Sequence, residues 1–274
     1  KLFAMTLRYA SLGSGSSGNA LVIEARCAGE TTRLLLDCGF SVRETEKRLA
    51  RLNLTGHDID AILVTHEHDD HIGGVARFAR KFGTALYMSR GTYLSVLNHN
   101  HSCEHLNVNF CTDHRSFAIK NIHVNPYTVP HDAREPLQFT FQCNDVHLGV
   151  LTDVGHITPT VVRALQGCHG LVLEYNYDAQ MMAQSKYPPT LRHRITGDYG
   201  HLDNTIAQEL LLQLIHSDLH HVHAAHVSQN NNDATKVASL LNQALAPHQI
   251  PYHVACQDEG FDWFSVEVRA ALSA

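Results

Sequence analysis

The sequence predicts an α/β fold in which two β-rich layers lie between helices, and two observations predict it. Apolar, β-rich runs recur along the chain, at residues 21–24, 33–37, 61–65, 85–89, 146–152, 170–174 and 220–225. Helical patterns follow several of these runs, and this order of strands and then helices repeats roughly once. Because no linker, low-complexity tract or short repeat interrupts the chain, we expect residues 1–274 to form a single domain.

Local signals mark where the helices begin. Ser41 with Glu44 three residues later is a capping box, and apolar positions follow it to residue 52. Thr158 precedes Pro159, and proline suits the first position of a helix. Apolar residues line one face of two further segments, 203–217 and a helix that begins at Asp233. The sequence therefore predicts helices after the strands of each half.

The composition is that of an ordinary globular protein. The chain has 274 residues, of which 44% are hydrophobic and 18% are charged. It has no apolar run long enough for a membrane span and no secretory signal at its start, so we expect a cytoplasmic protein without a membrane partner. Residues 1–4 precede Met5, which we expect to be the native first residue. The sequence does not predict the oligomeric state.

Cysteine count and net charge exclude two classes of protein. The 7 cysteines are odd in number and include no CxxC pair, which argues against a disulfide framework and against a cysteine-based zinc site. The formal net charge of -6 argues against a protein that wraps DNA on a basic surface. A local basic groove remains compatible with that charge.

The opening stretch SLGSGSSGNALVIEA, residues 11–25, resembles a phosphate-binding loop only superficially. A P-loop ends in a lysine followed by a helix, whereas this stretch lacks lysine and runs into a predicted strand. Two interpretations stay open. The stretch is either a glycine-rich turn between two strands or a loop whose amides face a ligand at another site.

The stretch AILVTHEHDDHIGG, residues 61–74, carries the strongest chemical signal. A buried strand leads into His66 and His68, whose side chains leave the same face of an extended chain. Asp70 and His71 follow where the backbone turns, and the glycines at 73–74 permit a tight turn into a helix. Imidazole and carboxylate groups at this spacing can hold two neighbouring cations. A solvated polar loop is the alternative, but it does not require four ligand-type residues within six positions.

The motif resembles the HxHxDH signature of the metallo-β-lactamase superfamily, and the resemblance continues along the chain in the order of that family. His131 in VPHDA, Asp153 in LTDVG and His226 in AAHVSQNN match the later motifs. The resemblance implies an αββα four-layer sandwich with two metal ions. One ion would be held by His66, His68 and His131; the other by Asp70, His71 and His226; and Asp153 would bridge the two.

Longer strings resemble the YycJ (WalJ) subfamily of that superfamily over nearly the whole chain. These strings include SLGSGSSGNA, LLLDCGFS, LEYNYD, YPPTLRHRITGDYGHLDN and HVSQNNND. The resemblance implies 5′ exonuclease action on DNA, or a less specific metal-dependent hydrolase or cyclic phosphodiesterase activity.

Glu174 and His201 match a pair that ribonuclease Z-like enzymes use to protonate the leaving oxygen. Glu174 ends a predicted strand and His201 lies just before a predicted helix. With Asp70, they are our catalytic candidates, because an imidazole oriented by a carboxylate is suited to general-acid catalysis. The alternative is that Glu174 only braces a neighbouring ligand and that His201 is a surface residue.

Substrate contacts are expected in the opening loop, in residues 186–194 and at Asn231. In related phosphodiesterases the first glycine-rich hairpin lies beside the metals, so the loop residues are candidates for phosphate contacts. The segment KYPPTLRHR, residues 186–194, combines cations with Tyr187 and no acidic residue, although it could equally be a solvated loop. The candidate substrate-binding residues are Ser14, Ser16, Ser17, Asn19, Lys186, Arg192, Arg194 and Asn231.

The sequence thus predicts a di-metal phosphodiesterase in which two cations activate a bridging hydroxide, with zinc or manganese as the cofactor. The interval between Asp153 and His226 is too short for a large inserted nucleic-acid clamp, which favours single strands, ends or small esters as substrates. We expect a nuclease that prefers DNA to RNA. The alternatives are a small-molecule cyclic phosphodiesterase, a promiscuous hydrolase with weak β-lactamase activity, and a binding protein without catalysis.

Overall fold

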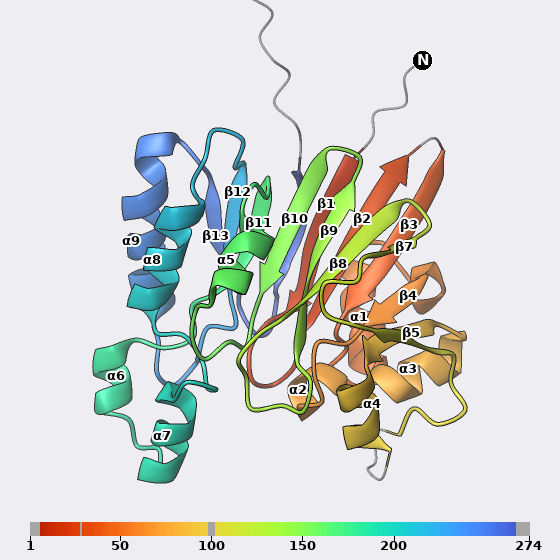
Figure 1. The fold of residues 1–274 in the computed structure, drawn as a ribbon, viewed down its shortest axis with the longest axis horizontal. Coiled ribbons are helices and arrows are strands. Elements are labelled where there is room, and N and C mark those ends of the chain that lie inside the picture. The colour runs from red at the N-terminus through yellow and green to blue at the C-terminus, as the bar shows by residue number, and fades with distance from the viewer. Residues whose placement is uncertain (1–5, 28, 98–101, 267–274) are drawn as a thin grey trace, which may run out of the picture.

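The two β-rich layers are two seven-stranded sheets packed face to face in the computed structural model (Figure 1). The structure describes residues 6–27, 29–97 and 102–266, so the expected start at Met5 lies outside the described residues. Within those ranges no helix combines the length and the apolar character needed to cross a membrane.

The first sheet has the strand order β14-β1-β2-β3-β4-β5-β6, and the second has the order β13-β12-β11-β10-β9-β8-β7. The strands of the first sheet are β1 (Thr6–Gly13), β2 (Ala20–Cys27), β3 (Glu30–Leu36), β4 (Ala61–Leu63), β5 (Ala85–Ser89), β6 (Val108–Cys111) and β14 (Phe261–Val266). The strands of the second sheet are β7 (Phe117–Ile119), β8 (Ile122–Thr128), β9 (Leu137–Cys143), β10 (Val146–Leu151), β11 (Gly170–Glu174), β12 (His221–Ala225) and β13 (Tyr252–Val254).

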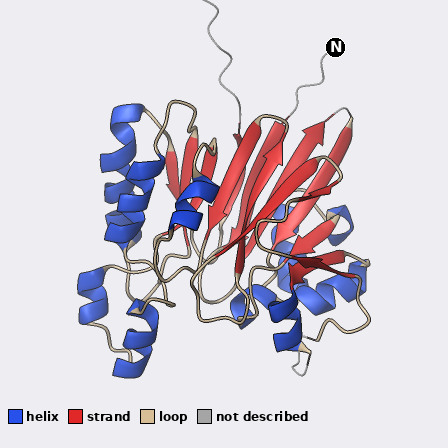
Figure 2. Cartoon of the chain, viewed as in Figure 1, coloured by secondary structure: helices blue, strands red, loops and turns tan. Residues whose placement is uncertain are grey.

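Helices cover the outer face of each sheet (Figure 2). On the first sheet lie α1 (Val42–Arg51), α2 (Asp69–Ile72), α3 (Val75–Phe82) and α4 (Arg90–Val96), with the short 3-10 helix η1 (Gly56–Asp58). On the second sheet lie α5 (Pro159–Leu165), α8 (Asn204–Leu214) and α9 (Ala234–Leu245), followed by the 3-10 helix η2 (Ala246–His248). The remaining two, α6 (Ala179–Ala183) and α7 (Pro189–Thr196), form an arm that projects from one end of the molecule (Figure 1).

Three layers of apolar side chains hold these elements together. The central layer lies between the sheets and includes Tyr9, Phe139 and Phe141, all of them fully buried. One outer layer joins the first sheet to α1 and α3, and the other joins the second sheet to α5, α8 and α9. The expected αββα sandwich is therefore confirmed.

The predicted helix starts are confirmed, with one difference at Ser41. Thr158, Asp203 and Asp233 each accept a hydrogen bond from an amide in the first turn of the helix that follows. Ser41 Oγ likewise accepts from Glu44 N, at 3.3 Å. The Glu44 carboxylate, however, accepts from Arg48 Nε at 2.8 Å rather than from the cap, so the capping box is only half formed.

Two loop interpretations have different outcomes. The stretch after β1 is a turn that joins β1 to β2 in an antiparallel hairpin, as the first interpretation expected. The segment 186–194, for which a loop was the alternative, instead enters α7, with Pro189 in the first turn. Because α7 buries none of its residues, its apolar pattern gives no core-facing stripe that would predict a helix from sequence.

The topology brings the carboxyl ends of several strands to one edge of the sandwich. In the first sheet β3, β4 and β5 run parallel, and in the second sheet β10, β11 and β12 run parallel. Chain segments that leave parallel strands at the same end lie next to one another. Most motif residues follow these strands, and His131 follows β8, which runs in the direction of β10 because both pair antiparallel with β9. The fold therefore gathers the motif residues at that edge.

Candidate metal centre and substrate cleft

Three histidines predicted to share a cation lie together. His66 Nε2 is 3.0 Å from His68 Nδ1, and His131 Nε2 is 3.2 Å from the same atom. His66 and His131 are buried, whereas His68 is partly exposed. Three imidazole nitrogens at this separation match the arrangement around one tetrahedral ion.

A second group of possible ligands lies beside the first. Asp70 Oδ2 is 3.3 Å from His71 Nε2 and 3.4 Å from His226 Nε2. Asp153 reaches both histidines, with Oδ2 3.2 Å from His71 Nε2 and Oδ1 3.4 Å from His226 Nε2. His66 can also form a group with His71 and Asp153, so Asp153 lies between the two sets of ligands.

The residues present suit divalent cations. Asp153 Oδ2 is buried and has no hydrogen bond among the described residues, and its nearest charged partner is His71 Nε2 at 3.2 Å. A buried carboxylate oxygen that only an ion pair satisfies suits a position next to a cation. His131 Nδ1 lies 3.1 Å from Gly200 O, which fixes the ring and directs Nε2 toward the cluster. The donor set of imidazoles and carboxylates is one that zinc and manganese both accept.

Asp37 is the main contributor that the sequence analysis missed. Its carboxylate accepts from Thr65 N at 2.8 Å and from Thr65 Oγ1 at 2.9 Å, and it lies 2.8 Å from His71 Nδ1. Because a carboxylate only accepts, this contact holds the His71 proton on Nδ1 and leaves Nε2 for a metal. The sequence signal that could have identified Asp37 is the position of its carboxylate directly after the buried strand β3.

Strained backbone marks three of these residues. Asp37, Asp153 and His226 have φ values of 60°, 52° and 53°, in the left-handed region that non-glycine residues rarely adopt. Such conformations cost about 1–3 kcal/mol each and persist where the surrounding structure fixes them, commonly at functional sites. In each case the residue directly follows the end of a strand or lies within two residues of it.

Two residues of the opening loop support the cluster from behind. Ser14 Oγ accepts a hydrogen bond from His226 N at 2.8 Å. Asn19 Nδ2 donates to Asp70 Oδ2 at 3.1 Å and lies 3.1 Å from His71 Nε2. Both Ser14 and Asn19 are buried, so the turn joining β1 to β2 fixes ligand positions.

The glycine pair after the motif is required for close packing rather than for a turn. Gly73 and Gly74 have φ values of −52° and −100°, which any residue adopts. A Cβ on Gly74 would lie 1.9 Å from Phe40 O, and Gly74 N donates to Cys38 O at 2.7 Å. The expectation of a glycine-dependent turn was wrong: Gly74 is small because the chain after β3 packs against it.

Burial and mutual charge determine the protonation of the cluster without cations. Burial lowers the pKa of His66 well below its usual value, and His71 lowers it further. Burial would also lower the pKa of His71 and His226, but Asp153 and other carboxylates outweigh it, placing the pKa of His226 at about 10 and that of His71 well above its usual value. The same two histidines hold the pKa of Asp153 well below its usual range, against the effect of burial. Cation binding must therefore displace protons from His71 and His226.

Glu174 and His201 form a pair at the edge of the cluster. His201 Nδ1 is 2.7 Å from Glu174 Oε1 and 3.6 Å from Asp153 Oδ1. Glu174 is fully buried and its Oε2 accepts from Val154 N at 3.0 Å. His201 is partly exposed and lines the neighbouring cleft, so its Nε2 is the nitrogen available to a substrate.

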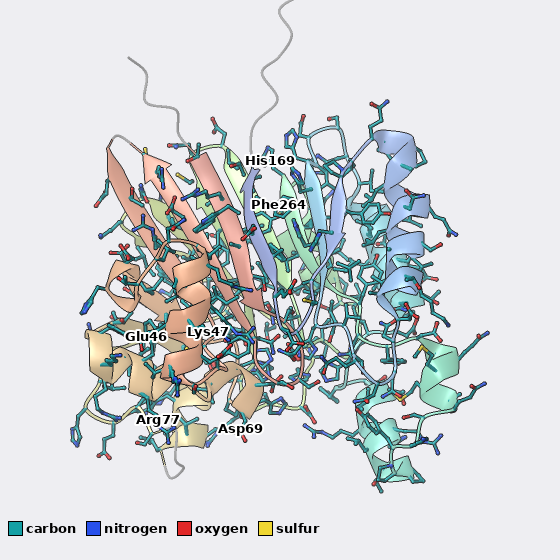
Figure 3. All side chains as sticks on the ribbon, turned by 180° about the vertical axis from the view of Figure 1, so that it is seen from behind. Glu46, Lys47, Asp69, Arg77, His169 and Phe264 are labelled. Carbon is teal, nitrogen blue, oxygen red and sulfur yellow. The ribbon has the colours of Figure 1, made fainter. Side chains whose placement is uncertain are left out.

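The cleft beside the cluster has a volume of about 380 Å³. One wall carries site residues including Asp70, Asp153 and His201, and the facing wall is formed by the arm, through Tyr187, Leu191, Arg194 and Ile195. Asp69 also lines the cleft and lies at the end of the molecule from which the arm projects, opposite the end that carries His169 (Figure 3).

The structure separates the predicted substrate residues into two groups. Ser16 and Arg194 line the cleft. Ser17 is exposed in the turn, where its amide donates to Gln257 Oε1 at 2.8 Å, and it does not line the cleft. Lys186, Arg192 and Asn231 are also absent from the cleft lining.

Two of these absences have a clear structural reason. Arg192 Nη1 donates to Ala183 O within the arm, at 3.1 Å, so its guanidinium points away from the metal cluster's wall. Asn231 is 1% exposed, and neither atom of its side-chain amide has a hydrogen-bond partner among the described residues. The basic groove expected from 186–194 thus contributes one cation to the cleft, Arg194.

Comparisons with known proteins agree with this geometry. The family model described as the metallo-beta-lactamase superfamily matches residues 13–234. Exodeoxyribonuclease YycJ of Bacillus anthracis is 32% identical over 248 residues, which cover 88% of this chain and 90% of that protein. Exodeoxyribonuclease WalJ of Streptococcus pneumoniae serotype 2 is 31% identical over 230 residues, covering 82% of this chain and 83% of that protein. Among solved structures, Zn²⁺-bound PqqB from Methylobacterium extorquens superposes with a TM-score of 0.69 at 14% identity, covering 95% of this chain and 100% of that chain, a likeness of fold alone.

Proposed function

Because the chain belongs to the metallo-beta-lactamase superfamily and is a metal-dependent hydrolase, we propose that it is a di-metal phosphodiesterase acting as a nuclease on DNA ends or single strands. The observation that carries the proposal is the position of Asp153. Its carboxylate lies between two groups of ligands: Oδ2 is 3.2 Å from His71 Nε2 and has no hydrogen bond among the described residues, and Oδ1 is 3.4 Å from His226 Nε2. A carboxylate that bridges two sites is the arrangement expected for a pair of neighbouring cations.

Seven side chains would hold the cations. The first would bind His66, His68 and His131, the second would bind Asp70, His71 and His226, and Asp153 would bridge them. Zinc suits this imidazole-rich set, and manganese would suit the carboxylates. Bound there, the pair would lower the pKa of a coordinated water and neutralise charge on a phosphodiester.

His201 would supply the proton that the leaving oxygen needs. Its Nδ1 is held by Glu174, so a proton on Nε2 faces the cleft where the phosphodiester would lie. Glu174 is a positioning residue, because it is fully buried and contacts His201 and the proposed ligand His226, whose Nδ1 lies 3.6 Å from Glu174 Oε1. Asp70 would act as a ligand on the cleft wall, kept in place by Asn19.

Nucleic acid as the substrate is supported by the names of the relatives and by the cleft. Both relatives are named exodeoxyribonucleases and align over more than four fifths of this chain. The cleft presents Arg194 and the hydroxyl of Ser16, which can contact phosphate oxygens beside the cluster. Ser14 and Asn19 would act indirectly, since they hold His226 and Asp70.

The proposal is tested by turnover of end-labelled single-stranded DNA, the same sequence in RNA, and bis-p-nitrophenyl phosphate, with added Zn²⁺ or Mn²⁺. We expect stepwise shortening of the DNA from an end. Asp153→Ala should abolish all turnover, while Asp58→Ala, outside the cleft, should retain it. Activity that survives in Asp153→Ala would come from a contaminant, and turnover of the small ester alone would favour a small-molecule phosphodiesterase.

A further inference from the structure

The helix α7 presents an apolar face to the cleft instead of to the protein core. Leu191, Arg194 and Ile195 are separated by three and four positions, which places them on one face of the helix. All three line the cleft, and α7 buries none of its residues. Leu191 and Ile195 are therefore partly exposed residues that line the same cleft as Asp70, Asp153 and His201.

Tyr187 extends this face with an aromatic ring. It lines the cleft just before α7 begins, and its hydroxyl accepts a hydrogen bond from Asn230 Nδ2 at 2.9 Å. Asn230 lies in the loop that follows His226, so this contact ties the arm to a segment that carries a proposed metal ligand. Tyr187 thus adds an aromatic residue, held at its hydroxyl by Asn230, to the lining of the cleft.

Arg194 places a positive charge between this apolar face and the metal centre. It forms an ion pair with Asp132 Oδ2, and Asp132 Oδ1 lies 3.6 Å from His68 Nε2 and 3.5 Å from His131 Nε2. Among the residues that line the cleft, Arg194 is the one lysine or arginine. A ligand that fills the cleft therefore meets a cation beside the cluster and an apolar, aromatic wall farther out.

We propose that this wall binds the unpaired terminal nucleobase of the strand, with Tyr187 stacking on the base, Leu191 and Ile195 packing beside it, and Arg194 contacting the adjoining phosphate. The inference rests on the proposed nuclease function and specifies its substrate. Bases of any identity present a flat aromatic face, so such a wall gives little sequence preference. A base inside a duplex is already stacked and paired, so the enzyme selects ends whose terminal base is unpaired.

The size of the cleft agrees with a single nucleotide. At about 380 Å³ it lies near the lower limit of ligand pockets, which span roughly 300–1,000 Å³. A nucleotide also matches the two kinds of side chain in the cleft, because it joins an apolar ring to an anionic phosphate. The ring would contact the apolar face of α7, and the phosphate would lie near Arg194 and the metal centre.

The test measures stacking without relying on turnover. The probe is a single strand with 2-aminopurine at the terminal position and a phosphorothioate at the linkage to be cleaved, which slows hydrolysis. It is titrated with metal-loaded protein and followed by fluorescence. We expect quenching on binding, because stacking on an aromatic ring quenches 2-aminopurine. Tyr187→Ala should abolish the quenching and raise the dissociation constant about tenfold.

Matched variants and a matched strand control the interpretation. Tyr187→Phe retains the ring and should keep the quenching with a dissociation constant within about threefold of the wild type. Tyr199→Ala removes an exposed tyrosine that does not line the cleft, and should bind as the wild type does. A strand whose terminal residue is abasic should bind wild type and Tyr187→Ala equally.

Two results would overturn the inference: no change in affinity or quenching in Tyr187→Ala, or the same loss of affinity for the abasic strand as for the strand with a base. Failure of the nuclease proposal would give a different result. An ordinary phosphodiester strand would then bind and show quenching, but the wild type would cleave it no faster than Asp153→Ala does.

Discussion

Replacing Asp37 with asparagine tests whether contacts behind the cluster determine which nitrogen of His71 meets a cation. In the structure the Asp37 carboxylate lies 2.8 Å from His71 Nδ1 and accepts two further hydrogen bonds from Thr65. Asparagine keeps the shape of the side chain but turns one oxygen into an NH₂ donor. If the amide oxygen keeps the contact with Thr65 N, the NH₂ group faces His71 Nδ1, and the imidazole proton must move to Nε2.

That proton would occupy the nitrogen that faces Asp70 and Asp153. His71 Nε2 lies 3.3 Å from Asp70 Oδ2 and 3.2 Å from Asp153 Oδ2, so it is the atom available to the second cation. Changes to such supporting contacts typically lower metal affinity about 10- to 100-fold. Since a tenfold change corresponds to about 1.4 kcal/mol, we expect Asp37→Asn to cost roughly 1.4–2.7 kcal/mol of binding free energy at one of two sites.

The assay is a titration of metal-free protein with Zn²⁺ in competition with a chromophoric chelator. We expect one dissociation constant to rise by the stated factor and the other to change only a few-fold. Asp37 contacts the second site directly at His71, but it is linked to the first site through Thr65 Oγ1, which lies 3.0 Å from His66 Nδ1. Asp58→Asn is the matched control. It removes a carboxylate that pairs with Arg33, and it should leave both metal dissociation constants unchanged. Equal weakening of both sites, or of neither in a variant that melts as the wild type does, would refute the reasoning.

Three further predictions concern the cleft, the proton donor and the core. Arg194→Ala should raise KM for a single-stranded oligonucleotide about tenfold in steady-state kinetics. Arg192→Ala should change KM less than about twofold, because of the two arginines only Arg194 lines the cleft. Similar changes in KM for the two variants would contradict this assignment. His201→Ala should lower kcat on DNA by about 10²- to 10⁴-fold but lower it far less on bis-p-nitrophenyl phosphate, whose leaving group needs no proton, and equal losses would exclude a general-acid role. Burial lowers the pKa of His223 from 6.5 to about 2, so below pH 6.5 the unfolded chain binds a proton that the folded chain does not. The free energy of unfolding should then fall by about 1.7 kcal/mol between pH 6.5 and 5, with a slope that approaches about 1.4 kcal/mol per pH unit at the lower pH. Urea denaturation should show that His223→Phe loses this part of the pH dependence, and the same slope in the variant would show that other groups cause it.

The centre of the site was predictable because its residues are close together in the sequence. His66, His68, Asp70 and His71 lie within one short stretch after a buried strand, so their proximity follows from the covalent chain. The helix starts were predictable for the same reason, since each cap bonds an amide two or three residues away.

Contacts between distant segments were not predictable from these patterns. Asp37 acts on His71 because β3 and β4 pair in parallel and bring the ends of both strands together. Several strands were missed as well. β7 has only three residues, and the seven-residue β8 contains Pro126 and alternates polar with apolar residues, so neither gives the longer apolar run that marked the predicted strands.

The directions of the basic side chains in residues 186–194 were not predictable, because they depend on the helix α7, which the sequence analysis did not predict. Pro188 precedes α7 and Pro189 is its first residue, so no side chain caps the helix. No residue of α7 is buried, so the segment also lacks a core-facing stripe. Once the helix is known, the two-residue separation puts Arg192 and Arg194 on different faces. The opening loop is similar: its role in holding His226 through Ser14 depends on contact across 212 positions of the chain.

The most direct test of the two-cation claim is to titrate Mn²⁺ into metal-free protein while measuring both bound metal and hydrolysis of an end-labelled single strand. We predict that activity rises until two ions are bound per chain and then remains constant, and that Asp153→Ala neither binds the second ion tightly nor cleaves the strand. Full activity at one ion per chain, or two tightly bound ions in a protein that cleaves no phosphodiester, would contradict the account.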